Sequence, residues 1–185
     1  MTFALIRHGQ TDWNFARRLQ GTTDIPLNDV GRQQALTAAP LLTGHWDAIV
    51  SSPLGRARET ASIIATELGI ELGGTYPGFI ERHYGKAEGA NAEIIRASWP
   101  DHDYPEMEPA DAVTERGLLA LEQLAAEYGD ANVAIVSHGT LIRLTLTAIA
   151  GREIEPLENC SISTLERTAD GWAVIAAGAT RVASV

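Results

Sequence analysis

Three short apolar runs, each ending in polar side chains, constrain the fold of this chain more than any other feature. They are TFALIRH (2–8), WDAIVSS (46–52) and NVAIVSH (132–138), and such runs are typical of buried strands. Segments with helical periodicity lie between and after them. This alternation predicts an α/β fold, a three-layer α/β/α sandwich in which helices cover both faces of a mostly parallel central sheet.

The boundaries of several elements can also be predicted. The expected helices cover 28–44, 52–69, 109–129 and 139–151, and several of them end at glycine, a common C-terminal cap. Ser51 or Ser52 is expected to cap the second of these helices, with Pro53 in its first turn. The tail 161–178 is predicted to form two strands joined by a turn at Asp170-Gly171.

The length of 185 residues favours a single domain over 1–185, long enough to bury a full core. The stretch 73–108 fits the alternating pattern poorly, because it is rich in glycine, proline and aromatic residues. We expect a loop with room for one short helix there. This stretch is interpreted as a lid or substrate-facing insert and not as a second domain.

Composition excludes several classes of partner. The formal net charge of −10 would repel a polyanion over most of the surface, so nucleic acid is not expected as a ligand. No apolar stretch approaches the ~20 residues of a membrane span, and the first residues lack the pattern of a secretory leader, so we expect a cytoplasmic protein without a membrane partner. Cys160 is the only cysteine, which excludes an intrachain disulfide and a thiolate-rich metal site. The sequence leaves the oligomeric state open.

Polar side chains meet where the predicted strands end. In an open parallel sheet every strand delivers its carboxyl end to the same edge, and ligands bind there. The three runs bring Arg7-His8, Ser51-Ser52 and Ser137-His138 to that edge, and Arg56 follows in the helix after the second run. Arginine offers a permanent charge and a fork that matches two phosphate oxygens, and histidine offers a nucleophile that can be neutral near pH 7. The pattern therefore predicts a site for a small phosphate-like dianion.

Five motifs in order resemble the histidine phosphatase superfamily, the phosphoglycerate mutase-like family. They are RHGQT with DWN (7–14), QGTTDIPLNDVGRQQA (20–35), SSPLGRARETA (51–61), ERHYGKAEG (81–89) and VSHGTLIR (136–143). A lone Arg-His-Gly would be weak evidence, whereas five motifs spread over most of the chain are specific. The resemblance implies a phosphoglycerate mutase-like fold and phosphoryl transfer through a phosphohistidine.

The same resemblance assigns the catalytic and phosphate-binding roles. His8 would attack phosphorus and become a transient phosphohistidine, and Glu81 would protonate the leaving oxygen and then take a proton from water. The phosphoryl oxygens would be bound by Arg7, Asn14, Arg56, His138 and the backbone of Gly139.

Substrate contacts would come from Gln20, Gly21 and Tyr84. No metal and no cofactor are implied, since arginines and histidines supply the positive charge. The expected partner is a small phosphorylated metabolite.

Local features separate two activities found on this scaffold. The mutase pattern carries a lysine shortly after the ERHYG motif and an adjacent arginine pair, but Ala92 stands at the lysine position by counting, and Arg96 stands alone. The residues after RHG are Gln-Thr, whereas mutases usually carry Glu-Ser there. These differences favour a metal-independent phosphomonoesterase. A cofactor-dependent phosphoglycerate mutase is the alternative, and an inactive phosphate-ligand-binding protein is a third reading.

Overall fold

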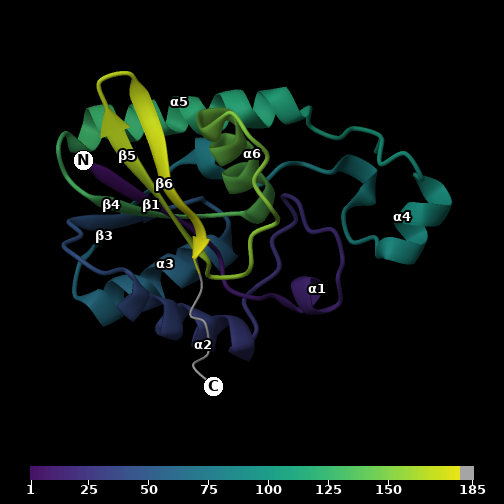
Figure 1. The fold of residues 1–185 in the computed structure, drawn as a ribbon. Coiled ribbons are helices and arrows are strands. Elements are labelled where there is room, and N and C mark those ends of the chain that lie inside the picture. The colour runs from purple at the N-terminus through teal and green to yellow at the C-terminus, as the bar shows by residue number, and fades with distance from the viewer. Residues whose placement is uncertain (180–185) are drawn as a thin grey trace.

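The computed structural model describes residues 1–179 and shows one mixed sheet between helices (Figure 1). The elements in chain order are β1 (Thr2–Arg7), α1 (Asp12–Phe15), α2 (Asp29–Ala38), η1 (Ala39–Leu41), β2 (Ala48–Ser51), α3 (Gly55–Leu68), β3 (Glu71–Thr75), η2 (Pro77–Phe79), η3 (Gly85–Ala87), α4 (Ala92–Ser98), α5 (Ala110–Tyr128), β4 (Val133–Ser137), α6 (Gly139–Ala150), β5 (Ile162–Thr168) and β6 (Gly171–Ala179).

The strands run in the order β3-β2-β4-β1-β5-β6. The pairs β1–β4, β2–β4 and β2–β3 are parallel, whereas β1–β5 and β5–β6 are antiparallel. Arg7 pairs with Ser137, and Ser51 pairs with Val136, so β1, β2 and β4 end side by side. The predicted meeting of three strand ends at one edge is therefore confirmed.

Helices cover both faces of the sheet, with α2 and α3 on one side and α5 and α6 on the other (Figure 1). Alternate residues of β1 point to opposite faces, as in any strand. Phe3 and Leu5 join the core under α5 and α6, while Ala4 and Ile6 join the core over α2 and α3. This two-sided burial confirms the α/β/α sandwich and explains why residues 3–6 of β1 and 133–136 of β4 are all apolar.

Two local expectations were wrong. Helix α3 begins at Gly55 with Leu54 as the N-cap residue and without a side-chain cap, so Pro53 lies outside the helix. The hydroxyl of Ser52 instead lies 2.7 Å from His138 Nε2, while the N–H of Leu54 donates to it at 3.3 Å. Strand β3 was not expected, because its sequence ELGGT has no apolar run and most of it is exposed at the edge of the sheet.

The chain between β3 and α5, residues 76–108, crosses the edge where the parallel strands end. We call it the 76–108 segment. It contains the 3-10 turns η2 and η3 and the short helix α4, which projects from the sheet on the side of α1 (Figure 1). The expectation of a loop with one short helix over 73–108 is met for residues 76–108, with the two turns added, but residues 73–75 belong to β3. The segment closes on itself through an antiparallel bridge between Tyr84 and Met107.

Candidate active site

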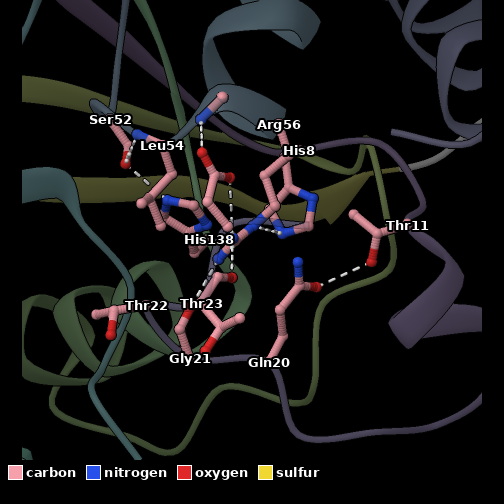
Figure 2. Close-up of polar contacts among 12 residues, drawn as sticks. His8, Thr11, Gln20, Gly21, Thr22, Thr23, Ser52, Leu54, Arg56 and His138 are labelled. Carbon is pink, nitrogen blue, oxygen red and sulfur yellow. Dashed lines mark hydrogen bonds and ion pairs between the residues drawn. The ribbon is translucent and has the colours of Figure 1, made fainter. Parts of the chain in front are cut away.

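His8 lies at the end of β1 with its ring held in one tautomer. Its Nδ1 lies 2.7 Å from the carbonyl oxygen of Gly9, which can only accept, so Nδ1 carries the proton. Its Nε2 accepts a hydrogen bond from Arg56 Nε at 3.2 Å and therefore presents a lone pair (Figure 2). The ring is 3% exposed. The geometry is that of a neutral histidine whose Nε2 lone pair faces a buried arginine.

Arg56, the second residue of α3, is fully buried and is held by two backbone carbonyls. Its Nη1 donates to Thr23 O at 2.9 Å and its Nη2 donates to Gly21 O at 2.7 Å. The carboxylate of Asp24 lies 3.5 Å from Nη1. These directed contacts fix the guanidinium against His8, which is the position predicted from the sequence.

Several buried N–H groups around His8 have no acceptor within residues 1–179. They include Nε of Arg7 and Nε2 of Gln20, and Nδ1 of His138 is a buried ring nitrogen that also lacks a partner. Buried donors are normally paired, because an unpaired one costs about 1–3 kcal/mol. Such donors beside one lone pair indicate a site shaped for the oxygens of an anion.

The orientation of Gln20 follows from its neighbours. Its Oε1 accepts from the hydroxyl of Thr11 at 2.9 Å (Figure 2). The same oxygen accepts from Asn14 Nδ2 at 3.3 Å. With the oxygen used in this way, the amide N–H groups turn toward His8 and Arg56. Asn14 lies in the wall of the site, with its amide oriented by this bond and by the N–H of Thr11, which donates to its Oδ1 at 3.1 Å.

His138 ends β4 and is the N-cap residue of α6. Its Nε2 lies 2.7 Å from the Ser52 hydroxyl, and its ring centroid lies 5.1 Å from that of His8. Gly139 opens α6 beside Arg7, since a Cβ added at Gly139 would lie 3.3 Å from Arg7 Nε. A side chain there would crowd the guanidinium, so glycine keeps this approach open.

Glu81 faces the start of α6 from the 76–108 segment and is 8% exposed. Its two oxygens accept from the N–H groups of Thr140 and Leu141, each at 3.1 Å, and Oε1 also accepts from its neighbour Arg82 N at 2.8 Å. Tyr84 lies next to it, with its hydroxyl 2.6 Å from that of Thr140. The segment therefore brings a carboxylate and a phenol to the same helix end that carries His138.

The electrostatics of the site keep both histidines neutral. Burial lowers the pKa of His8 well below its ordinary value of 6.5, and the nearby Arg56 and Arg7 lower it further. Burial likewise lowers the pKa of His138 well below 6.5, with Arg56, His8 and Arg7 adding to the effect. Burial lowers the pKa of Arg56 to about 10, so this group remains charged at neutral pH.

A cavity of about 210 Å³ opens between these groups. Its wall includes all but one of the site residues predicted from the sequence: Arg7, His8, Asn14, Gln20, Gly21, Arg56, Glu81, Tyr84 and Gly139. His138 lies behind them against His8. The structure therefore brings the whole predicted set together.

Sequence reasoning missed other residues at this site. Arg18 and Arg143 also line the cavity. Arg143 lies one helical turn after Gly139, and long helical side chains lean toward the N-terminus of their helix, so spacing alone could have found it. Thr60 donates to Arg56 O at 2.7 Å and accepts from Gly9 N at 3.1 Å, a contact between β1 and α3 that no local signal reveals.

Two general properties complete the description of residues 1–179. No group of three or more His, Cys, Asp or Glu side chains lies together in a way that could hold a metal ion. None of the helices in this part of the chain is both long and apolar enough to cross a bilayer.

Comparison with known proteins gives a consistent result. The family model for the histidine phosphatase superfamily (branch 1) matches residues 3–180. An uncharacterized phosphatase PhoE from Bacillus subtilis is 39% identical over 175 residues, covering 92% of this chain and 90% of that protein. A probable phosphoglycerate mutase GpmB from Photorhabdus laumondii is 34% identical over 197 residues, covering 94% and 91%.

Among solved structures, a mycobacterial glucosyl-3-phosphoglycerate phosphatase in complex with VO3 superposes with a TM-score of 0.88. It is 28% identical in sequence, and the match covers 97% of this chain and 99% of the other.

Proposed function

The chain belongs to the histidine phosphatase superfamily, and on that basis we propose that it is a metal-independent phosphomonoesterase that hydrolyses a small phosphorylated metabolite through a phosphohistidine at His8. The observation that carries this proposal is the set of buried donors without acceptors around the His8 lone pair. They supply to three phosphoryl oxygens what phosphoryl transfer chiefly needs, which is positioning and charge stabilisation.

In the first step, the Nε2 lone pair of His8 forms a bond to phosphorus while the bond from phosphorus to the ester oxygen breaks. Glu81, in its protonated form, gives its proton to that oxygen, so the alcohol leaves neutral. Arg7, Arg56 and His138 hold the oxygens of the transferring group. The carbonyl of Gly9 keeps the proton on Nδ1 and so keeps Nε2 available.

In the second step, water attacks the phosphohistidine. Glu81, now a carboxylate, takes a proton from the water as its oxygen bonds to phosphorus, and the bond between phosphorus and nitrogen breaks. Inorganic phosphate leaves, and His8 and Glu81 return to their starting protonation states. The 76–108 segment supplies Glu81 and Tyr84, and we propose that it acts as a lid on the single domain.

The cavity favours a small substrate with a second anionic group. Its volume of about 210 Å³ is below the ~300–1,000 Å³ of sites for drug-sized ligands. Arg18 and Arg143 line it in addition to Arg7 and Arg56, and neither pairs with a carboxylate in the described part of the chain. The name of the mycobacterial neighbour specifies a phosphoglycerate, which carries a carboxylate beside its phosphate.

Phosphoglycerate mutase is the second candidate, because a related protein is described as a probable mutase. The sequence at the carboxylate-binding positions argues against it. Ala92 and Arg96 lie on α4, and neither belongs to the cavity wall. Isomerisation also requires the enzyme to retain a bisphosphorylated intermediate, which takes more anion contacts than hydrolysis does.

The test uses p-nitrophenyl phosphate in the presence of EDTA. We expect release of phosphate and, after rapid quenching, an acid-labile phosphoenzyme that maps to position 8. The substitution His8→Ala should lower turnover by about 10⁴-fold or more. His45→Ala, which changes an exposed histidine, is the matched control and should keep full activity.

Two outcomes would overturn the proposal. Full activity of the His8→Ala protein would rule out a phosphohistidine intermediate at position 8. Rapid formation of 2-phosphoglycerate from 3-phosphoglycerate with a trace of the 2,3-bisphosphate would make the protein a mutase.

A further inference from the structure

Glu88 lies in the 76–108 segment, just after η3, and its carboxylate is surrounded by neutral donors. Oε1 accepts from Thr22 N at 2.9 Å, from the Thr22 hydroxyl at 3.2 Å and from Tyr84 N at 3.1 Å. Oε2 accepts from Thr23 N at 2.8 Å and from the Thr23 hydroxyl. The side chain is 10% exposed, and His83 Nε2 lies 3.9 Å from Oε1.

The backbone that Glu88 holds is the backbone that aims Arg56. The carbonyls of Gly21 and Thr23 accept the two Nη groups of Arg56, and Arg56 Nε meets His8 (Figure 2). The chain of contacts therefore runs from Glu88 to the peptides of Thr22 and Thr23, then to Arg56, and then to the reacting nitrogen. A shift of residues 21–23 would move the acceptors that orient the guanidinium.

We infer that Glu88 is a positioning residue, whose carboxylate fixes residues 21–23 so that their carbonyls aim Arg56 at the phosphoryl group on His8. The inference rests on the proposed function for its role in catalysis. It assigns to Glu88 no contact with the substrate, since Glu88 is not part of the cavity wall. Through Tyr84 N, the same carboxylate also ties the leaving-group side of the cavity to the phosphate side.

An ionised carboxylate is required at this position. Each oxygen accepts from a backbone N–H, and a backbone N–H cannot become an acceptor. Glutamine has the same shape, but whichever way its amide turns, its NH₂ group meets a backbone donor. Burial alone would raise the pKa of Glu88, but the hydrogen bonds from Thr23, Thr22 and Tyr84 outweigh it and lower the pKa.

Gly21 shows how closely the carboxylate approaches this loop. Gly21 has φ +57°, and a Cβ added there would lie 2.0 Å from Glu88 Oε1. Any other residue would therefore be strained in its backbone and would push the carboxylate away. Gly21 was predicted from the sequence to contact the substrate. The structure shows that a glycine at this position also leaves room for the carboxylate of Glu88.

The segment stays attached to the loop without Glu88. Leu19 N donates to Ala90 O at 2.9 Å, Gly89 N donates to Leu19 O at 2.7 Å, and Arg18 Nη1 donates to Gly89 O at 3.1 Å. Substituting Glu88 by glutamine leaves these bonds in place. It should therefore disturb the aim of Arg56 more than the docking of the segment.

The experiment is a double-mutant cycle between Glu88→Gln and Arg56→Ala, read by calorimetric binding of inorganic phosphate and by kcat/KM for p-nitrophenyl phosphate. We expect Glu88→Gln to weaken phosphate binding by about tenfold when Arg56 is present, and by less than about twofold when it is absent. Glu106→Gln, which changes an exposed carboxylate of the same segment, is the matched control and should change neither quantity.

Equal losses in both backgrounds would overturn the inference, because Glu88 would then act independently of Arg56. If the Glu88→Gln protein does not fold, Thr23→Val decides instead, since it removes one donor to Oε2 and keeps the shape. It should weaken phosphate binding severalfold while Thr23→Ser does not, and equal binding by the two variants would again overturn the inference. The measurement of phosphate binding tests the role of Glu88 even if the protein hydrolyses no ester. A lack of hydrolysis would contradict the proposed function and not the inference about Glu88.

Discussion

The two sides of the cavity are built in different ways. On the phosphate side, His8 and Ser52 follow β1 and β2, the two strands that flank β4, and backbone bonds to β4 fix them, from His8 N to Ser137 O at 2.9 Å and from Ser52 N to Val136 O at 2.9 Å. On the leaving-group side, Glu81, Tyr84 and Glu88 come from an irregular segment. Side chains hold that segment through partners 56 to 66 residues away in the chain, and two backbone bonds to Leu19 add to them.

The difference teaches where this architecture can vary. Strand register fixes His8, Ser52 and His138, whereas the loop at residues 21–23 orients Arg56. The groups that would meet the rest of the substrate depend on a few hydrogen bonds from an irregular segment, which can change without cost to the core. One scaffold can in this way keep phosphoryl transfer constant while the leaving group changes.

Glu81→Gln gives the largest effect that separates the two sides. A poor leaving group such as an alkyl alcohol needs a proton, whereas p-nitrophenolate does not. We expect kcat/KM for glycerol 3-phosphate to fall by about 10²-fold or more, and that for p-nitrophenyl phosphate to fall much less. Because the same carboxylate activates water, p-nitrophenol should appear in a burst followed by slow turnover. Steady-state and stopped-flow assays on the two esters measure both effects.

Arg7→Ala is the matched comparison from the phosphate side. It removes a donor to the phosphoryl group, which both esters share, so both rates should fall by a similar factor. A Glu81→Gln protein that loses activity equally on the two esters would show that Glu81 is not the proton donor.

Arg143→Gln tests whether the leaving-group side of the cavity also binds a second anionic group of the substrate. Arg143 lies near Tyr84, since its charge lowers the pKa of that phenol against the larger opposing effect of burial. We expect kcat/KM for 3-phosphoglycerate to fall by about tenfold and that for glycerol 3-phosphate to be unchanged, because a charge-assisted hydrogen bond contributes about 1.5–3 kcal/mol. The two esters are of similar size and differ mainly in the carboxylate. An equal fall in kcat/KM for the two esters would contradict a site for a second anionic group of the substrate. Arg152→Gln, which changes an exposed arginine, is the control.

The phosphate side could be predicted from the sequence because it follows from strand order. Apolar runs that end in Arg7-His8 and Ser137-His138 need only the rule that parallel strands end together. Two local features in the same region could not be predicted from the sequence, strand β3 and the N-cap of α3. Strand β3 is exposed and glycine-containing, so it has no apolar run, and the cap of α3 was missed because the Ser52 hydroxyl is taken up by His138.

The leaving-group side could be predicted only through the family resemblance. The motif ERHYG identified Glu81 and Tyr84, but nothing in the local pattern says that Glu88 meets Thr22 and Thr23, 66 and 65 residues earlier. Such side-chain contacts to distant backbone have no periodicity. They depend on how the whole segment crosses the sheet edge, which the local sequence does not encode.

The smallest expected effect is on the pH dependence of the melting temperature, Tm, and it compares the buried histidines of the phosphate side with His83 of the 76–108 segment. His8 and His138 are buried with pKa values well below 6.5, so below pH 6.5 the unfolded chain binds protons that the folded chain cannot bind. Stability contributed by these two rings is therefore present above pH 6.5 and is lost as the pH falls toward their folded pKa values. We expect Tm to fall between pH 7 and pH 5, by roughly 2–4 °C for each kcal/mol lost in a chain of this size.

The double substitution His8→Asn with His138→Asn should flatten this slope, whereas His83→Asn, at a half-exposed position in the 76–108 segment, should leave it unchanged. Scanning calorimetry at matched ionic strength measures the slopes, and an equal slope in all three proteins would show that the buried rings are not the source of acid sensitivity.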